Sequence, residues 1–144
     1  MVPIIIDCTF RDGGYHNAWD FTPHIVQDYL QAMDAIAVDY VELGFRSLEN
    51  NCYKGPFAYC TDSFILSLSV PFGLKVGVMV NASEIAKHPE GPIHILEKLF
   101  APANQSPVTL VRLACHYEEL VGILNACDWL DRKRSCRERV SSPV

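Results

Sequence analysis

The stretch "PIIIDCTFRDGGY", residues 3–15, joins an apolar segment to a polar one that contains two glycines. Residues 3–7 form a short run rich in isoleucine, which is typical of a strand buried on both faces of a parallel sheet. Arg11 and Asp12 follow in what we expect to be a loop, where the glycines allow a tight turn. Active sites of parallel α/β proteins lie at the carboxyl ends of their strands. The stretch therefore predicts an α/β fold with functional residues just after its first strand.

Three further apolar runs predict strands at residues 39–45, 74–80 and 108–114. Segments with helical features separate them, so the chain contains four consecutive βα units. This order predicts a parallel sheet with helices packed on it, either a doubly wound open sheet or a (β/α)8 barrel. By length alone, 144 residues suit a complete open sheet, since a closed barrel needs about 250 residues.

Helical spacing of apolar residues places the helices between these strands. Thr22 and Pro23 suit an N-cap and a first helical position, so a helix is expected to begin there. A brief helix is expected after Asp62, and residues 83–100 have helical character in parts, with prolines interrupting them. The apolar stripe expected on the last helix consists of Tyr117, Leu120, Val121, Leu124 and Cys127.

The composition describes one folded domain. Of 144 residues, 49% are hydrophobic and 20% are charged, and the net charge is −5. A folded core is therefore expected, and a nucleic-acid or anionic membrane partner is not. The six cysteines lack C-x-x-C spacing, no signal peptide precedes the first strand, and no apolar run is long enough to span a membrane. We expect a cytoplasmic protein with reduced thiols.

Residues 131–144 depart from this pattern. They contain five basic and two acidic residues, a net charge of +3, whereas residues 1–130 carry −8. They also lack apolar periodicity where a further strand would be expected. Two interpretations follow: a disordered basic tail, since charge blocks of this kind usually stay solvated, or non-native sequence after a coding region that ends near Leu130. We therefore assign residues 1–130 to the α/β unit and treat residues 131–144 as a separate tail.

The residue types after the first strand suit enolate chemistry. Asp12 could provide a hard oxygen ligand to a divalent metal. Arg11 carries a fixed positive charge on a planar donor fork, which suits a carboxylate or a developing enolate oxygen. The alternative is a non-catalytic module in which Arg11 and Asp12 form a surface ion pair of little energetic value. Spacing alone does not decide between these alternatives.

Several segments also resemble one family of enzymes. The stretch "IIDCTFRDGGYHNAWDF", residues 5–21, is similar to the N-terminal signature D-x-T-x-R-D-G of metal-dependent TIM-barrel lyases and acyltransferases. This group includes 3-hydroxy-3-methylglutaryl-CoA lyase, 4-hydroxy-2-oxovalerate aldolase and isopropylmalate synthase. The longer form with "DGGY" resembles its HMGL-like branch, also described as aldolase-catalytic-domain proteins. Residues 39–60, 74–81 and 111–116 resemble the same enzymes, in the same order.

This resemblance implies that residues 1–130 form the first half of a (β/α)8 barrel, four βα units of eight, despite the length argument. It implies a divalent-metal-dependent aldolase or lyase that uses Mn²⁺ or Mg²⁺ and forms an enolate of a 2-oxo acid or an acyl-thioester. In the family the metal is held by the aspartate of the R-D pair, here Asp12, and by an H-x-H pair on a late strand. No H-x-H occurs in the sequence, so we expect the chain alone to be inactive. The full-length protein could be a homo-oligomer.

The resemblance also suggests roles for single residues. Arg11 would stabilise the enolate oxygen. Tyr15 replaces the family's catalytic histidine and His16 follows it, so both are candidates for proton transfer while the catalytic base stays unassigned. Glu42, in an apolar strand, would lie near the metal-bound water or, equally, form a buried ion pair with Arg11 or Arg112. The residues expected to bind an anionic substrate are Arg46, Arg112 and Asn17.

Overall fold

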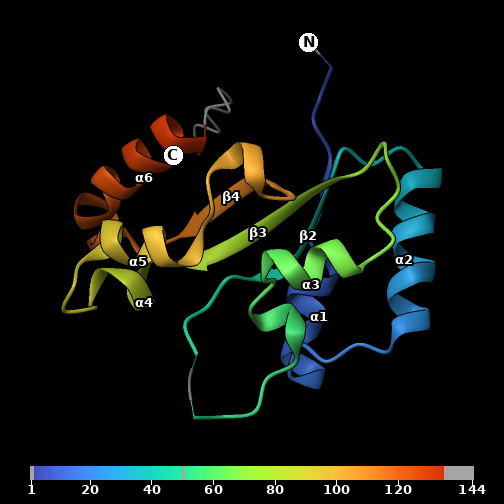
Figure 1. Cartoon of the computed structure of the whole chain (residues 1–144), viewed down its shortest axis with the longest axis horizontal. Coiled ribbons are helices and arrows are strands. Elements are labelled where there is room, and N and C mark those ends of the chain that lie inside the picture. The colour runs from blue at the N-terminus through green and yellow to red at the C-terminus, as the bar shows by residue number, and fades with distance from the viewer. Residues whose placement is uncertain (1, 50, 135–144) are drawn as a thin grey trace.

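The computed structural model describes residues 2–49 and 51–134. Four parallel strands form one sheet in the order β1-β2-β3-β4, so every strand lies beside the one that precedes it in the chain (Figure 1). A doubly wound sheet reverses its strand order at a switch point, whereas a (β/α)8 barrel does not. The observed order is therefore that of a partial barrel. The strands are β1 (Ile6–Asp7), β2 (Tyr40–Phe45), β3 (Lys75–Asn81) and β4 (Val108–Ala114).

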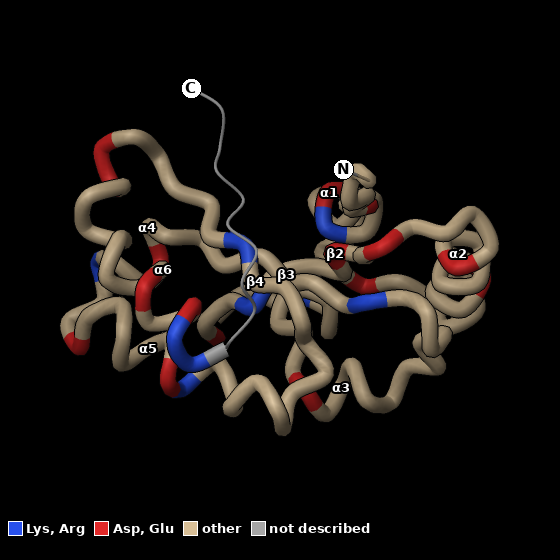
Figure 2. The backbone as a smooth tube through the Cα atoms, turned by 90° about the horizontal axis from the view of Figure 1, so that it is seen from above, with Lys and Arg blue, Asp and Glu red and all other residues tan. Residues whose placement is uncertain are grey.

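Helices cover this sheet on both sides and at its two ends. Figure 2 shows α1 and α3 on opposite sides of the strands, and Figure 1 shows α2 and α6 at opposite ends of the sheet. Within the described residues, no helix is both long enough and apolar enough to cross a membrane. The helices are α1 (Thr9–Asn17), α2 (Pro23–Ala35), α3 (Asp62–Ser67), α4 (Ala82–Ala86), α5 (Pro92–Leu99) and α6 (Leu120–Arg134), with short 3-10 turns η1 (Pro56–Ala58), η2 (Ala103–Gln105) and η3 (Tyr117–Glu119).

The segment after β1 is a helix, whereas the sequence suggested a loop. Helix α1 contains Gly13 and Gly14, and each glycine lowers helix stability by about 1 kcal/mol relative to alanine. Packing explains the glycine at residue 14, because a Cβ there would lie 2.0 Å from the indole ring of Trp19. Ala18 ends the helix with a left-handed φ of 56°, and the Trp19 amide then donates to the Gly14 carbonyl at 3.0 Å. Contacts of the helix with Trp19 and, through Phe10, with Tyr29 of α2 thus override the loop signal.

The apolar face of α6 that packs against the protein is not the expected one. Its buried residues are Ile123, Ala126 and Leu130, which are at most 8% exposed. Val121 and Leu124 of the predicted stripe are 81% and 50% exposed instead. Both faces of the helix are apolar, and periodicity alone does not say which of them meets α4 and α5. The prediction of the buried face was therefore wrong.

Helix α6, described over Leu120–Arg134, continues past the predicted boundary at residue 130. The first residues of the predicted tail, 131–134, are therefore helical. Residues 135–144 lie outside the described residues, so both interpretations of the tail stay open there.

The core lies between the two central strands and the helices. Residues 41–45 of β2 and 76–80 of β3 are all buried, whereas most of β4 is only half-buried. Phe10 in α1 stacks between Phe21 and Tyr29, with ring centroids 4.2 Å and 4.0 Å away. This aromatic stack fixes α1 over the end of β1 and against α2. The core therefore positions the residues that follow β1.

Candidate active site

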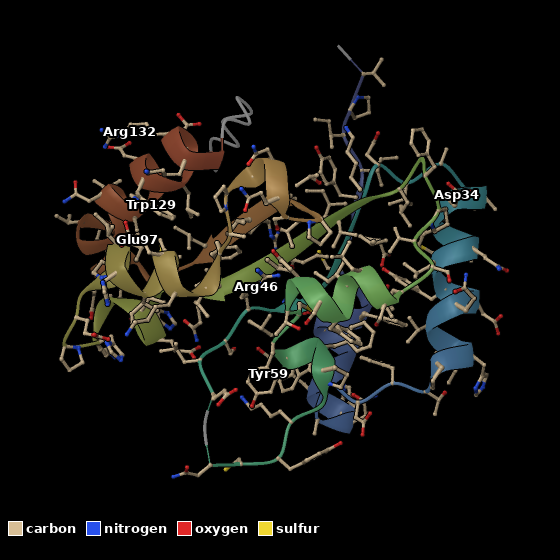
Figure 3. All side chains as sticks on the ribbon, viewed as in Figure 1. Asp34, Arg46, Tyr59, Glu97, Trp129 and Arg132 are labelled. Atoms are coloured by element: carbon tan, nitrogen blue, oxygen red, sulfur yellow. The ribbon has the colours of Figure 1, made fainter. Side chains whose placement is uncertain are left out.

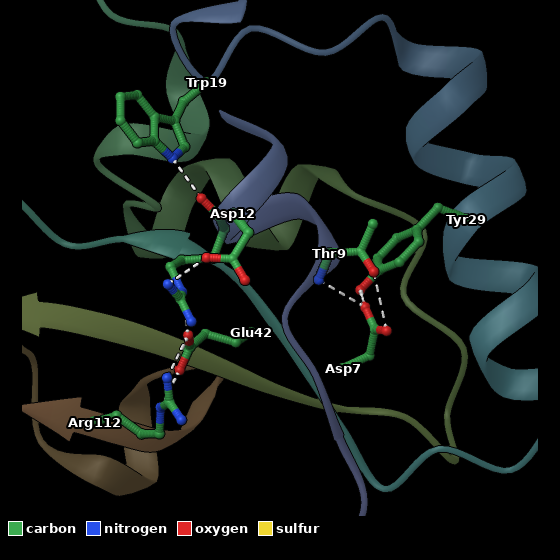
Figure 4. Close-up of polar contacts among 8 residues, drawn as sticks. Asp7, Thr9, Asp12, Trp19, Tyr29, Glu42 and Arg112 are labelled. Atoms are coloured by element: carbon green, nitrogen blue, oxygen red, sulfur yellow. Dashed lines mark hydrogen bonds and ion pairs between the residues drawn. The ribbon is translucent and has the colours of Figure 1, made fainter. Parts of the chain in front are cut away.

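Glu42 of β2 lies at the centre of a group of charged side chains (Figure 4). Its side chain is 0% exposed. Glu42 Oε1 accepts hydrogen bonds from Arg11 Nε at 2.7 Å and from a terminal amino group of Arg112 at 3.1 Å. Arg11 in turn donates to Asp12 Oδ1 at 2.5 Å. Side chains from α1, β2 and β4 thus form one continuous set of charges, which we call the Glu42 cluster: Arg11, Asp12, Glu42 and Arg112.

The second contact between Glu42 and Arg112 is an ion pair rather than a hydrogen bond. Glu42 Oε2 lies 2.6 Å from Arg112 Nε. The two atoms are poorly aligned, however, and neither has a hydrogen-bond partner in the described part of the chain. A buried carboxylate keeps its charge only when it is paired. Two arginines therefore hold Glu42, and its burial in turn fixes both guanidinium groups.

The strand register explains why these side chains meet. Glu42 pairs with Gly77 of β3, and Gly77 pairs with Leu110, two residues before Arg112. Side chains two apart on a strand share a face, so Glu42 and Arg112 lie on the same side of the sheet. Gly77 lies between them and carries no side chain that could separate them. The cluster is therefore a product of sheet register across three strands.

A network around Asp7 fixes α1, the helix that carries Arg11. The Asp7 carboxylate accepts hydrogen bonds from the Thr9 amide at 2.9 Å, the Thr9 hydroxyl at 3.1 Å and the Tyr29 hydroxyl at 2.6 Å. From the other side, Trp19 Nε1 donates to the Arg11 carbonyl at 3.1 Å. Sequence reasoning missed this network, although "DCT" has the pattern of a turn in which an aspartate accepts the amide two residues later. The backbone of Arg11 is thus held from two sides.

Burial, hydrogen bonds and charges shift the pKa values of groups in and near the cluster. Burial alone would lower the pKa of Arg11, but its hydrogen bonds to Glu42 and Cys8 raise that pKa above its ordinary value. Burial and the charge of Glu42 raise the pKa of the Cys8 thiol, partly offset by Arg11. Burial would raise the pKa of Asp7, but its hydrogen bonds, first that from Tyr29, lower the pKa overall. At neutral pH, Arg11 is therefore a cation, Asp7 a carboxylate and Cys8 a neutral thiol.

Arg46 lies apart from the Glu42 cluster. It is 3% exposed and donates to Asp62 at 2.6 Å, to the Leu99 carbonyl at 3.0 Å and to the Cys60 carbonyl. These bonds use both terminal amino groups of Arg46 and join the end of β2 to α3 and α5. The structure therefore gives Arg46 a packing role, and the substrate-binding role expected for it stays a prediction.

A bulge in β2 separates Arg46 from the cluster. Simple alternation from Glu42 would put Arg46 on the same face of the sheet. The register between β2 and β3 shifts between Glu42 and Gly44, however. Phe45 therefore takes the face of the cluster, where it pairs with Met79, and Arg46 points to the opposite face. Such bulges often occur next to functional sites and re-aim a side chain.

The other predicted site residues lie farther along α1. Tyr15 is 65% exposed, and its ring packs edge-on against Trp19 with centroids 4.7 Å apart. His16 is exposed in the last turn of the helix. Asn17 Nδ2 donates to the Asp20 carbonyl at 3.0 Å, which orders the turn after the helix. Across residues 2–49 and 51–134, no hydrogen bond or ion pair joins these three to the cluster, so their functional roles stay predictions.

The capacity of these side chains to hold a metal is limited. The described residues contain no group of three or more His, Cys, Asp and Glu side chains that could bind a metal ion. The Asp12 side chain is 63% exposed and could offer one carboxylate ligand. The residues present therefore do not complete a metal site.

A surface pocket of about 670 Å³ lies elsewhere, between the loop after β2, α3 and the end of α5. Its lining includes Arg46 and Tyr59, which Figure 3 labels near α3, together with Asp62 and Lys98. No member of the Glu42 cluster lines this pocket. Sequence reasoning gave no signal for it, because the pocket forms only where the segment from the end of β2 to α3 meets the end of α5.

A solved structure resembles this chain over most of its length. It is described as the "N-terminal domain of a putative aldolase from Bacteroides vulgatus", with a TM-score of 0.76 and 28% sequence identity. The match covers 91% of this chain but 42% of the solved one, so this chain spans less than half of that protein. No protein-family model and no curated protein matches the chain. The fold is therefore an aldolase-like α/β fold, a partial barrel with four parallel strands.

Proposed function

We propose that the chain is the first half of a divalent-metal-dependent carbon–carbon lyase of the aldolase type. The observation that supports this proposal is the Glu42 cluster, which holds an arginine and an aspartate over the end of β1. The likeness to the Bacteroides vulgatus domain favours the same class. The substrate would be a 2-oxo acid or an acyl-thioester, because such compounds react through an enolate that a fixed cation stabilises.

In this proposal, Arg11 stabilises the enolate oxygen. Its Nε is bonded to Glu42 and one terminal amino group to Asp12, so the guanidinium keeps one orientation. A cation that is already fixed needs no reorganisation when negative charge develops on the substrate. The Arg112 side chain is 36% exposed on the far side of Glu42 and would bind the substrate carboxylate.

Arg46 and Asn17 are weaker candidates for substrate binding. Arg46 is buried and donates to the Leu99 carbonyl, and Asn17 donates to the Asp20 carbonyl. At Arg46, a substrate would have to replace one of these bonds, and the buried group left without a partner would oppose binding. Asn17 is exposed, but among the described residues no hydrogen bond or ion pair joins it to the Glu42 cluster. We therefore rank Arg112 first.

Metal binding and proton transfer involve the exposed side of α1. Asp12 would supply one ligand to Mn²⁺ or Mg²⁺, and the remaining ligands would come from outside the described residues. The metal would polarise the 2-oxo group when bound. Tyr15 and His16 are the proposed proton-transfer groups, because both are exposed on the helix that carries Arg11 and Asp12.

Exchange of solvent deuterium into C3 of a 2-oxo acid tests this proposal, because such exchange reports enolate formation. In a version of the protein with a complete barrel and with Mn²⁺ present, Asp12→Ala should lower the exchange rate at least about 100-fold. Asp28→Ala, at an exposed aspartate of α2, is the matched control and should leave the rate unchanged. Arg11→Lys keeps the charge but loses the donor fork, and should lower the rate by about 10-fold or more.

Two results would contradict the proposal. If the Asp12→Ala protein exchanges solvent deuterium as fast as the parent, Asp12 takes no part in the chemistry. Metal-stimulated exchange by the 144-residue chain alone would show that the site needs no residues beyond it.

A non-catalytic binding module is the second candidate. It is favoured by one observation: the two cations and two anions of the Glu42 cluster balance one another, as in a structural ion-pair network. Calorimetric titration of the complete-barrel protein with Mn²⁺ separates the two functions. Under the first, Asp12→Ala abolishes the binding heat; under the second, the titrations of parent and variant are the same.

A further inference from the structure

Three aromatic side chains lie on the face of the sheet that carries the Glu42 cluster, and we call Tyr15, Trp19 and Phe45 the aromatic triad. Their ring centroids are 4.7 Å apart for Tyr15 and Trp19, 5.6 Å for Trp19 and Phe45, and 6.2 Å for Tyr15 and Phe45. All three pairs meet edge to face, an arrangement that aromatic rings prefer. Trp19 and Phe45 are at most 9% exposed, whereas Tyr15 is 65% exposed in the described part of the chain. Tyr15 is therefore the member of the triad that a ligand can reach.

The aromatic triad lies directly beside the cations of the Glu42 cluster. Tyr15 follows Arg11 by four residues on α1, so the two side chains lie on the same face of that helix. On the sheet, Met79 of β3 pairs with Phe45 of β2 and with Arg112 of β4. An apolar side chain therefore lies between the triad and the guanidinium group of β4. A cationic region and an aromatic region are thus adjacent, and a ligand with an acidic end and an apolar end would contact both.

The backbone at Trp19 is strained. Ala18 and Trp19 have consecutive left-handed φ values of 56° and 57°, a conformation that a bulky residue rarely adopts. This backbone brings the indole ring back over Gly14, and Trp19 Nε1 donates to the Arg11 carbonyl at 3.1 Å (Figure 4). Strain of this kind persists only where the surrounding structure fixes it, and it is common at ligand-binding sites. The fold therefore holds the triad and Arg11 in one fixed arrangement.

We propose that the aromatic triad selects the substrate of this enzyme: a 4-hydroxy-2-oxo acid with a flat apolar group, such as phenyl, at C4. The inference rests on the proposed function, in which Arg112 binds the substrate carboxylate and Arg11 faces the 2-oxo group. The C4 group then extends over Met79 to the ring of Tyr15. Contact with this ring adds a specific aromatic interaction to the burial of apolar surface. Tyr15 is thus the specificity-determining residue, through its ring rather than its hydroxyl group.

The cleavage reaction leaves the selected group on the aldehyde product. A base removes the proton of the 4-hydroxyl group, and the electrons of that O–H bond form the aldehyde carbonyl as the C3–C4 bond breaks. The electron pair of the broken bond forms the C2–C3 double bond of an enolate, whose negative oxygen faces Arg11. A proton then adds to C3 and gives the second product, pyruvate. The triad contacts only the aldehyde half, so it sets which aldehyde is released and leaves the enolate chemistry unchanged.

Calorimetric titration with two unreactive carboxylates tests the inference in the complete-barrel protein without added metal. 4-Phenylbutanoate and pentanoate share the carboxylate and differ in the group that would contact the triad, and we expect the phenyl compound to bind at least about 10-fold more tightly. Tyr15→Ala should reduce this preference to less than about 3-fold, whereas Tyr15→Phe keeps the ring and should retain the preference. The matched control is Phe72→Ala, at an exposed aromatic residue before β3, which should bind as the parent does. Tyr15→Ala with the full preference of the parent would overturn the inference.

Turnover with Mn²⁺ separates failure of the inference from failure of the proposed function. The ratio of kcat/KM for cleavage of 4-hydroxy-2-oxo-4-phenylbutanoate to that for 4-hydroxy-2-oxopentanoate should be about 10 or more in the parent and should fall in Tyr15→Ala. If pyruvate exchanges solvent deuterium but the parent does not prefer the phenyl compound, the triad only packs, so the inference is wrong and the proposed function stands. If the parent binds 4-phenylbutanoate selectively but neither exchanges pyruvate nor cleaves either substrate, the proposed function is wrong, and so is the substrate assigned here.

Discussion

Arg11 and Arg46 each follow a strand of the same sheet, yet the fold uses them differently. Arg11 lies on the face where Glu42 is buried and contacts two carboxylates near the exposed side of α1. Arg46 points to the opposite face and bonds to α3, α5 and the segment before α3. An arginine after a strand therefore predicts a buried cation. The face of the sheet toward which this arginine points decides whether it can contact a substrate.

Gly44 is the local reason for this difference. A Cβ at Gly44 would lie 1.9 Å from the Phe57 carbonyl oxygen, so the approach of η1 to β2 requires a glycine there. The register shift of β2 ends at this residue. The close approach and the bulge together turn Arg46 away from the face that holds Arg11.

Removal of Glu42 should have the largest effect on stability, because Glu42 holds the face of the sheet on which Arg11 lies. Glu42→Ala leaves the guanidinium groups of Arg11 and Arg112 without their buried counter-ion, so the free energy of unfolding should fall by about 3 kcal/mol. Urea denaturation followed by circular dichroism measures this change. Glu49→Ala, at an exposed glutamate after β2, is the control and should change stability by less than about 0.5 kcal/mol. A loss below about 1 kcal/mol in Glu42→Ala would show that the cluster does not hold the strands together.

Arg46→Met tests the contacts on the opposite face of the sheet. The change leaves Asp62 and two carbonyl groups without their donor, which should cost about 2 kcal/mol of stability. The loss should be smaller than that of Glu42→Ala, because the Asp62 side chain is 22% exposed and can still bind water. Deuterium exchange per folded molecule in the complete-barrel protein should be unchanged. A selective loss of exchange would instead place Arg46 in the site.

Tyr29→Phe tests the hydrogen-bond network that holds α1, the helix that carries Arg11 but not Arg46. Loss of the hydrogen bond to the Asp7 carboxylate should lower stability by about 1.5 kcal/mol near neutral pH. The folded pKa of Asp7 is lowered from its ordinary value of 3.8, so its contribution is present above that value and is lost as pH falls through the folded pKa. The difference between the thermal melting points of parent and variant should therefore shrink below about pH 3.8. A difference that grows toward acid would contradict the assignment.

Asp12→Asn should have the smallest effect on stability. The Asp12 side chain is 63% exposed, and an exposed ion pair contributes less than about 0.5 kcal/mol. The same variant should lose most of its exchange activity in the complete-barrel protein. Together with the result for Glu42→Ala, this outcome would distinguish Asp12, a residue that takes part in the chemistry, from Glu42, a residue that supports the site. A stability loss above about 1 kcal/mol would favour the structural ion-pair interpretation.

Much of the fold could be predicted from local patterns. The run at residues 108–114 coincides with β4, and Pro23 begins α2 as its spacing indicated. The loop expected after β1 was a helix, and the contact of its Phe10 with Tyr29 of α2 is a tertiary effect that local patterns do not reveal. The buried face of α6 was also wrong, since the helix has two apolar sides and only one meets a neighbour.

The candidate site, like the fold, could be predicted from local patterns only in part. Adjacent Arg11 and Asp12 at a strand end, and Glu42 within an apolar strand, were recognisable as functional candidates because charge is unusual in such places. That Glu42 contacts both Arg11 and Arg112 depends on register across three strands. The separation of Arg46 depends on a bulge that simple strand alternation does not reveal.

By itself, the sequence determined the number and order of the βα units, since hydrophobic periodicity and turn residues act over a few neighbouring positions. It also determined which charged residues follow each strand. Only the tertiary structure decided which of these charges meet and which face of each helix is buried. The physical reason is that register, bulges and helix packing arise from contacts between segments far apart in the chain, and no local pattern encodes them.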